Sequence, residues 1–254
     1  MQCLKSIMLL TLGFSGICFA SYAAPPKYTA MKAGCKMIMD GILDEPAWQQ
    51  AQSAGPFKFQ WYESGEQEQT EAKIVWDNER IYFAFKCADK HIGADHYRAN
   101  DPVSMDDCCE AFIAPVPEGP QRLDYINYEI NCIGTWKVGY HAPSRNKVLG
   151  SWDTKWIEIG RYIRGTVNKD DDIDEGWVLE YSVPWSHFSE FGAKFPPKNG
   201  QVLYIGLHRT GGKTNLQYSQ WAPSQTEKPN FHSPKDFGKV TFSTKVLKED
   251  TDEI

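Results

Sequence analysis

The segment AKIVWDNERIYFAFKC, residues 72–87, contains two runs in which apolar side chains recur at every second position. The first run ends at Trp76, the second begins at Ile81, and the Asp77-Asn78 pair between them is typical of a tight turn. Successive side chains of a β-strand point to opposite faces, so each run predicts a strand with one buried face. The segment therefore predicts an antiparallel β-hairpin.

The same period of two recurs along the chain, at residues 109–113, 128–132, 177–183 and 203–207. Loops rich in Gly, Pro, Asn and Asp separate these segments, whereas helical signals are confined to residues 45–52 and 184–191. We predict an all-β fold, an antiparallel two-sheet β-sandwich of the jelly-roll or immunoglobulin-like type with one or two short helices. Four tryptophans in these periodic or helix-entry contexts are expected to fill the core: Trp48, Trp76, Trp177 and Trp185.

Residues 1–24 have the layout of a cleavable secretory signal, with Lys5 ahead of an apolar run at 7–20 and then small residues. We expect cleavage near Ala23 or Ala24 and an extracytoplasmic protein, periplasmic or secreted. The apolar run is too short to span a membrane, and no later segment is long enough. A lipoprotein anchored at Cys18 is the less favoured alternative, because the residue before it is not small.

The remaining chain is predicted to form one domain over residues 25–244, followed by a charged, flexible tail at 245–254. The net charge is −6 and no stripe of Lys and Arg occurs, which argues against nucleic-acid binding. Five cysteines lie beyond the signal, and their odd number leaves the pairing open. We expect Cys108 and Cys132 to be buried as small apolar side chains.

Five motifs in a fixed order resemble a family 9 carbohydrate-binding module, a sandwich related to DOMON-type domains. They are DGILDEPAW (40–48), AKIVWDNERIYFA (72–84), DCCEAFIAP (107–115), GWVLEYSVPW (176–185) and NFHSPKDFGKV (230–240). The resemblance implies a non-catalytic protein that recognises polysaccharide or oligosaccharide, mainly at chain ends, in support of carbohydrate catabolism. Such modules grip the sugar between two aromatic side chains, with a Glu, an Arg and an amide nearby.

Carried over residue by residue, the resemblance places the second clamp ring at Phe231, the ligand-contacting Glu at Glu110 and a further family Trp at Trp221. The first clamp ring should fall within residues 103–106, where no aromatic residue occurs. The family's ligand Arg falls on Glu129. The sequence therefore departs from the family pattern at two of its site positions.

Other residues offer substitutes for the missing groups. Trp61, Trp136 and Trp152 lie in or beside loops and are candidates for the absent clamp ring, with loop anchoring as the alternative. Arg209 ends a predicted strand, from which it could reach a ligand or neutralise Glu110 or Glu129. Glu110 and Glu129 are thus both ligand-binding candidates.

No cofactor is required by this interpretation, although a structural calcium is an option at Asp170, Asp172 and Asp174. These residues lack the spacing of a calcium-binding loop, and a solvated turn is the simpler interpretation.

Enzyme motifs are absent from the sequence, and Glu110 and Glu129 would suit a glycosidase pair only at a separation of about 5–10 Å. A second hypothesis is a haem-b-binding electron-transfer domain of the DOMON type. It would use Met105, His208 or His232 as axial ligands. A third is a protein-interaction module that has lost the sugar site. The oligomeric state stays open.

Overall fold

The computed structural model describes residues 24–145, 147–149 and 156–247. The predicted signal peptide up to residue 23, the candidate Trp152 and residues 248–254 of the predicted tail lie outside the described residues. No helix within the described ranges has the length and apolar character needed to cross a membrane.

The described residues contain twelve strands. They are β1 (Lys27–Ala33), β2 (Thr70–Trp76), β3 (Arg80–Ala88), β4 (Cys108–Ala114), β5 (Tyr125–Asn131), β6 (Trp136–Ala142), β7 (Lys147–Leu149), β8 (Glu158–Arg164), β9 (Gly176–Pro184), β10 (Val202–Thr210), β11 (Tyr218–Gln220) and β12 (Gly238–Leu247). The helical elements are α1 (Pro46–Gln50) and the 3₁₀ turns η1 (Val103–Met105), η2 (Pro120–Leu123), η3 (Pro143–Arg145), η4 (Trp185–Phe191) and η5 (Pro234–Asp236). Both predicted helical segments therefore contain short helices, and the predicted β-rich fold is confirmed.

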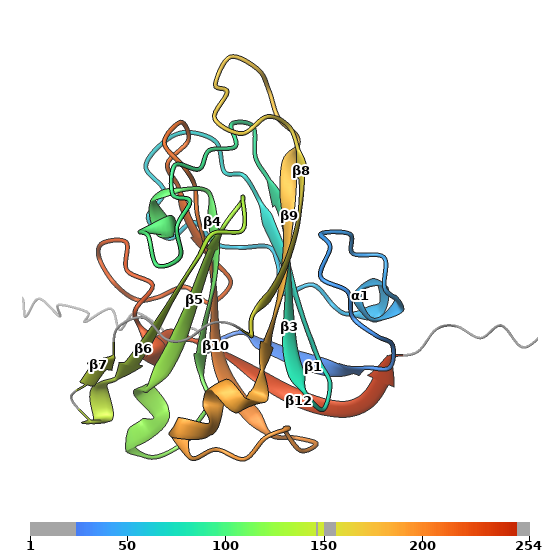
Figure 1. Cartoon of the computed structure of the whole chain (residues 1–254). Coiled ribbons are helices and arrows are strands. Elements are labelled where there is room, and N and C mark those ends of the chain that lie inside the picture. The colour runs from blue at the N-terminus through green and yellow to red at the C-terminus, as the bar shows by residue number, and fades with distance from the viewer. Residues whose placement is uncertain (1–23, 146, 150–155, 248–254) are drawn as a thin grey trace, which may run out of the picture.

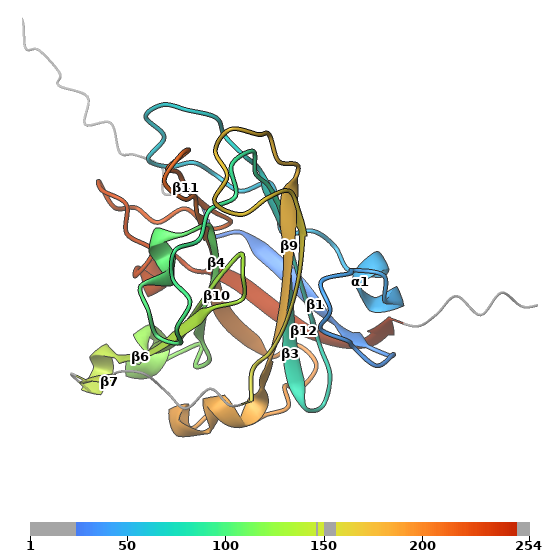
Figure 2. The ribbon, with the colours of Figure 1, turned by 45° about the horizontal axis from the view of Figure 1, so that its top comes forward.

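The strands form a two-layered β-sandwich whose layers are connected along one edge. Hydrogen bonds run through the order β7-β6-β5-β4-β10-β12-β1-β2-β3-β9-β8, and β11 pairs with β10. The strands β1 (blue) and β12 (red) lie side by side across the base of the molecule and join the β4–β5–β6 side to the β3–β9–β8 side (Figures 1 and 2). β1 pairs in parallel with both β12 and β2, whereas the other pairings between described strands are antiparallel. The sheet is therefore mixed, where an antiparallel one was predicted.

The predicted hairpin is present as β2 and β3, with Trp76 opposite Ile81. The side chain of Asp77 closes the turn, because its Oδ1 accepts the backbone N–H groups of Glu79 and Arg80 at 2.8 Å each. This is the local hydrogen bonding for which Asp is favoured in turns.

The main core lies between the two layers and is built from the alternating residues that the sequence indicated. The Sγ atoms of Cys87 in β3 and Cys109 in β4 lie 3.4 Å apart across this core, and both cysteines are free thiols. Trp76, Trp177 and Trp185 belong to the same core, and Trp48 fills a second cluster beneath α1. Cys108 and Cys132 are fully buried as predicted.

The motif containing Trp48 is held to the sheet by the motif containing Glu180. Oε1 of Glu180 accepts the backbone N–H groups of Asp40 at 3.0 Å and Gly41 at 2.6 Å, and Oε2 accepts Trp48 Nε1 at 2.9 Å. Two motifs far apart in the sequence thus meet at one buried carboxyl group.

The final strand corrects one predicted boundary. β12 runs to Leu247, where Val246 and Leu247 pair with Lys32 and Ala33 of β1, and Leu247 is buried. The first three residues of the predicted tail, 245–247, therefore belong to the sheet, since pairing with β1 outweighs their local charged character.

Candidate functional site

One row of polar side chains crosses the outer face of the sheet made by β6, β5, β4, β10 and β11. The strand register places Lys137 beside Glu129, Glu129 beside Glu110, Glu110 beside His208, and His208 beside Gln220. Directly paired residues of neighbouring strands point to the same face, so these five side chains form one line. The row places two carboxyl groups next to each other on the outer face.

Residues 221–237, between β11 and β12, cover part of this row. The ring of Phe231 stacks on His208 at a centroid distance of 4.3 Å and an interplanar angle of 12°. Phe112 contacts the same imidazole edge-on at 5.0 Å. A Cβ at position 206 would lie 2.3 Å from Nε2 of His208, so Gly206 provides the space that the imidazole occupies.

A cavity of about 340 Å³ opens above Glu110 beside this cover. The turn η1 contributes Ser104 and Met105, the sheet contributes Glu110, Thr210 and Tyr218, and the covering segment contributes residues 229–232. The side chain of Met105 is 66% exposed, the most exposed apolar group at the cavity. Apolar and polar groups therefore alternate around its wall.

The carboxyl group of Glu110 is the distinctive polar feature of the cavity. Glu110 is only 2% exposed, and its Oε1 has no hydrogen-bond partner among the described residues. Burial, and then the charge of Glu129, raise the pKa of Glu110 well above its usual range. Burial and the charge of Glu129 therefore favour the protonated form of Glu110, which can both donate and accept a hydrogen bond.

The neighbouring Glu129 is better supplied with partners. Its Oε1 accepts Nδ2 of Asn127 at 2.6 Å, its Oε2 lies 3.8 Å from Nζ of Lys137, and the hydroxyl of Ser104 donates to the same carboxylate. Burial raises the pKa of Glu129, whereas Lys137 opposes that shift. The negative charge shared by the pair therefore resides mainly on Glu129.

The histidines of this face add no positive charge at neutral pH. Burial lowers the pKa of His208 to about 3 and that of His141 to about 4. His141 stacks on Tyr125 at 4.6 Å, and its Nε2 lies 2.8 Å from Oδ1 of Asn127. Lys137 is consequently the one cation in the polar row.

The structure brings two of the predicted aromatic residues together. The ring of Trp61 lies 5.8 Å from Phe231 and 6.5 Å from Tyr218, and Trp61 Nε1 donates to the carbonyl of Thr226 at 2.8 Å. Trp61 thus supports the covering segment that carries Phe231. It lines a neighbouring cavity of about 290 Å³ that shares Tyr218 and Pro229 with the cavity above Glu110.

Two other predicted rings lie elsewhere. Trp221 belongs to the core between the layers, where it meets Tyr28 edge-on at 6.3 Å. Trp136 pairs with Ile130, and both pack on the core side of the sheet, opposite to Glu129. Trp136 begins β6 and Trp221 directly follows β11, and neither residue lines the cavity above Glu110.

Arg209 does not contact Glu110 or Glu129, contrary to expectation. It shares strand parity with the core residues Leu203, Ile205 and Leu207, so the sheet separates it from the polar row, and it is 0% exposed. Its Nη2 lies 2.9 Å from Oδ2 of Asp89, and its Nη1 donates to two backbone carbonyls. Arg209 is therefore enclosed by a structural network.

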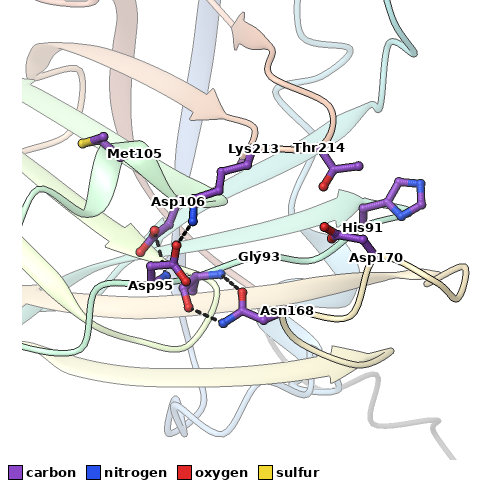
Figure 3. A pocket seen from close by; sticks show the side chains of 11 residues that line it. His91, Gly93, Asp95, Met105, Asp106, Asn168, Asp170, Lys213 and Thr214 are labelled. Atoms are coloured by element: carbon purple, nitrogen blue, oxygen red, sulfur yellow. Dashed lines mark hydrogen bonds and ion pairs between the residues drawn. The ribbon is translucent and has the colours of Figure 1, made fainter.

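The three calcium candidates do not converge. Asp174 is turned inward and accepts the N–H groups of Ile92 at 3.0 Å and Thr166 at 2.8 Å, whereas Asp172 contacts Lys169 at 3.2 Å. Asp170 lines a separate polar cavity of about 210 Å³, where it lies near His91 (Figure 3). Across the described ranges, no three His, Cys, Asp or Glu residues are arranged to hold a metal ion.

The cavity shown in Figure 3 adjoins the one above Glu110, since Met105 lines both. Its polar groups are largely bonded to one another: Asn168 exchanges two hydrogen bonds of 2.8 Å with the backbone of Ala94, and Lys213 pairs with Asp95. This internal pairing leaves it less suited to bind a ligand than the cavity with the unpartnered Glu110.

The candidate haem ligands are also near the cavity above Glu110. Met105 and His232 line it, but His208 lies beneath the stacked ring of Phe231. Ligation by His208 would require Phe231 to move away.

Several cavity residues escaped the sequence reasoning. Thr210 and Tyr218 reach the site because β11 pairs with the end of β10, and β11 is only three residues long. So short a strand has no detectable period. Asn230 could have been noted as the amide next to Phe231.

Comparison with known proteins identifies relatives of this fold. The family model for carbohydrate-binding family 9 matches residues 44–242. No curated protein sequence matches the chain at a significant level.

Solved structures share the architecture at low sequence identity. A protein from Bacteroides uniformis, described as carbohydrate-binding, superposes with a TM-score of 0.71 at 18% identity, covering 87% of this chain and 100% of its own. A family 9 module from Caldicellulosiruptor kristjanssonii in complex with cellotriose gives 0.59 at 13% identity, with 90% and 97% covered. A family 9 module from the same organism in complex with glucose gives 0.55 at 12%, with 89% and 100% covered.

Proposed function

Because the chain belongs to carbohydrate-binding family 9, we propose that its cavity above Glu110 binds the end of an oligosaccharide or polysaccharide chain. The observation that carries this proposal is the Glu110 carboxyl group, whose Oε1 has no hydrogen-bond partner among the described residues, in a cavity lined by both apolar and polar side chains. A sugar ring presents both apolar C–H faces and hydroxyl groups, and it needs both kinds of surface.

The lining residues divide these two tasks. Met105 and Tyr218 offer apolar surface to the faces of a pyranose ring, and Phe231, which is only 8% exposed, adds a small part of its ring. Glu110, Thr210 and Asn230 offer hydrogen-bonding groups to its hydroxyls. In this interpretation Met105, which lies within the segment 103–106 that lacks the first clamp ring, takes over part of that ring's role, since a thioether side chain adapts to irregular surfaces.

We propose binding without catalysis, in an extracytoplasmic protein that serves carbohydrate catabolism. The signal-like layout of residues 1–24 supports the location. The complexes of family 9 modules with glucose and cellotriose support a ligand as small as one to three sugar rings. A site of this size is expected to bind with micromolar to millimolar affinity.

Titration calorimetry of residues 24–254 with glucose, cellotriose and other β-linked trisaccharides tests the proposal. Phe231→Ala and Met105→Ala should each weaken binding about tenfold, since each removes contact area from the sugar face. Met105 is 66% exposed, so its truncation leaves the fold intact even if Phe231→Ala destabilises it.

The control is Tyr162→Ala, which removes an aromatic ring that is 48% exposed on β8, outside the cavity. It should bind as the parent protein does. Absence of binding to every sugar, or equal affinity of the Met105→Ala and parent proteins, would contradict the site assignment.

A further inference from the structure

The polar row places two carboxyl groups side by side, an arrangement that a neutral sugar does not require. Glu110 and Glu129 are directly paired across β4 and β5, and their residues are 2% and 3% exposed. Two buried carboxyl groups at neighbouring positions repel each other when both are ionised, and the repulsion is weakly screened away from water. Burial, and then the charge of Glu129, raise the pKa of Glu110, and protonation of Glu110 relieves this repulsion.

No cation of the protein occupies the cavity side of this pair. Among the described residues that line the cavity, none is Lys or Arg. Lys137 approaches Glu129 from β6, on the side away from Glu110, at 3.8 Å and with a side chain that is 40% exposed. Arg209 is unavailable because it pairs with Asp89 on the core side of the sheet.

The Glu110 carboxyl group therefore has no positive partner from the protein on the cavity side, so a ligand in the cavity can supply one. Oε1 has no hydrogen-bond partner among the described residues, and the residue faces the cavity. Phe231 and Tyr218, which line the same space, provide aromatic surface that also favours a cation.

We propose that this site selects an amino sugar, whose ammonium substituent binds between the Glu110 carboxylate and the rings of Phe231 and Tyr218. This inference rests on the proposed carbohydrate function and names the ligand class of the same cavity. The ammonium ion supplies the missing countercharge, and a charge-assisted hydrogen bond replaces the proton that Glu110 holds when the cavity is empty. Binding should therefore release one proton from Glu110 to the solvent.

Three β-1,4-linked trisaccharides that differ only at carbon 2 test this directly: the trimers of glucosamine, N-acetylglucosamine and glucose. Calorimetry at low ionic strength should show the glucosamine trimer binding roughly 10- to 100-fold more tightly than cellotriose, with the acetylated trimer no better than cellotriose. The preference should shrink as salt is raised. Buffers of different ionisation heat should reveal release of close to one proton for the glucosamine trimer alone.

Two variants locate the effect. Glu110→Gln should abolish both the preference for the glucosamine trimer and the proton release, whatever it does to the affinity for cellotriose. It should unfold at the same or a higher temperature, because an amide cannot ionise beside Glu129. The matched control, Glu175→Gln, changes a carboxylate whose side chain is 77% exposed. It should retain the full preference.

The groups that titrate or carry charge around Glu110 are Glu129 on β5, Lys137 and His141 on β6, His208 on β10 and His232 on the covering segment. Repeating the proton measurement in Lys137→Gln separates the contribution of the lysine from that of Glu110.

The outcomes separate the two proposals. Equal or tighter binding of cellotriose would overturn amino-sugar selection and leave the carbohydrate function standing. A preference that persists in Glu110→Gln, or that requires added calcium, would also overturn it. Failure of all three trimers to bind would overturn the carbohydrate function and this inference with it.

Discussion

Replacing Glu180 by Ala removes a buried carboxyl group that ties residues 40–48 to the sheet. Glu180 is 0% exposed, and it accepts hydrogen bonds from the backbone of Asp40 and Gly41 and from the indole of Trp48. The alanine variant leaves three donors without an acceptor. Trp48 is fully buried, so water cannot readily replace the lost partner of its indole.

The expected loss follows from these three donors. A buried donor left unpaired costs about 1–3 kcal/mol, and the burial that raises the pKa of Glu180 to about 7 offsets part of what the carboxylate contributes. We therefore expect Glu180→Ala to lower the free energy of unfolding by about 3–5 kcal/mol at pH 7. A typical domain is stable by only about 5–15 kcal/mol, so a loss of this size should be readily visible.

Urea unfolding followed by tryptophan fluorescence measures the effect. The matched control is Glu158→Ala on the neighbouring strand β8, whose side chain is 58% exposed and faces Ser182. An exposed ion pair contributes little, so the control should lose less than about 1 kcal/mol. If the two variants differ by less than about 1 kcal/mol, the three hydrogen bonds do not stabilise the fold as argued.

Three further predictions concern stability. Arg209→Met should lower the free energy of unfolding, measured with denaturant, by about 3–5 kcal/mol, because it leaves the buried carboxylate of Asp89 without its countercharge. Arg164→Met breaks an exposed ion pair of 3.8 Å with Glu175 and should lower it by about 0.5 kcal/mol or less. His208 takes up a proton near pH 6.5 when the protein is unfolded but only near pH 3 when it is folded, so the free energy of unfolding should fall as the pH is lowered through this range. In pH-dependent melting, His208→Gln should reduce the slope of stability against pH by the equivalent of up to one bound proton. An unchanged slope would contradict a buried neutral imidazole. Gly41→Ala should lower the melting temperature far more than Gly192→Ala. Both glycines have positive φ, but a Cβ at position 41 would lie 2.2 Å from the backbone of Arg161, whereas a Cβ at position 192 meets nothing within 4 Å. Equal losses would refute the packing argument.

The sequence predicted the strands well because their information is local. Alternation at 72–87 specifies two half-buried strands and the turn between them, and the observed pairing of β2 with β3 follows it. Alternation also placed Glu110 on the face opposite to Cys109 and Ala111, as the burial of those two in the core confirms. The same parity groups Arg209 with Leu203, Ile205 and Leu207, and it lies on the core side with them, paired with Asp89.

The sequence by itself determined the β-sandwich, the family and the side of the sheet on which Glu110 and Glu129 lie. Apolar residues at every second position are a local property of each strand, and they show which of its side chains are buried. Only the tertiary structure decided that the two glutamates are direct neighbours, that Phe231 and Trp61 meet, that Trp221 is part of the core and that Trp136 packs against it. Strand register and loop direction depend on hydrogen bonds and packing between segments separated by a hundred residues or more, such as Trp61 and Thr226. The cavity is made where those long-range contacts bring η1, the end of β10 and the covering segment together.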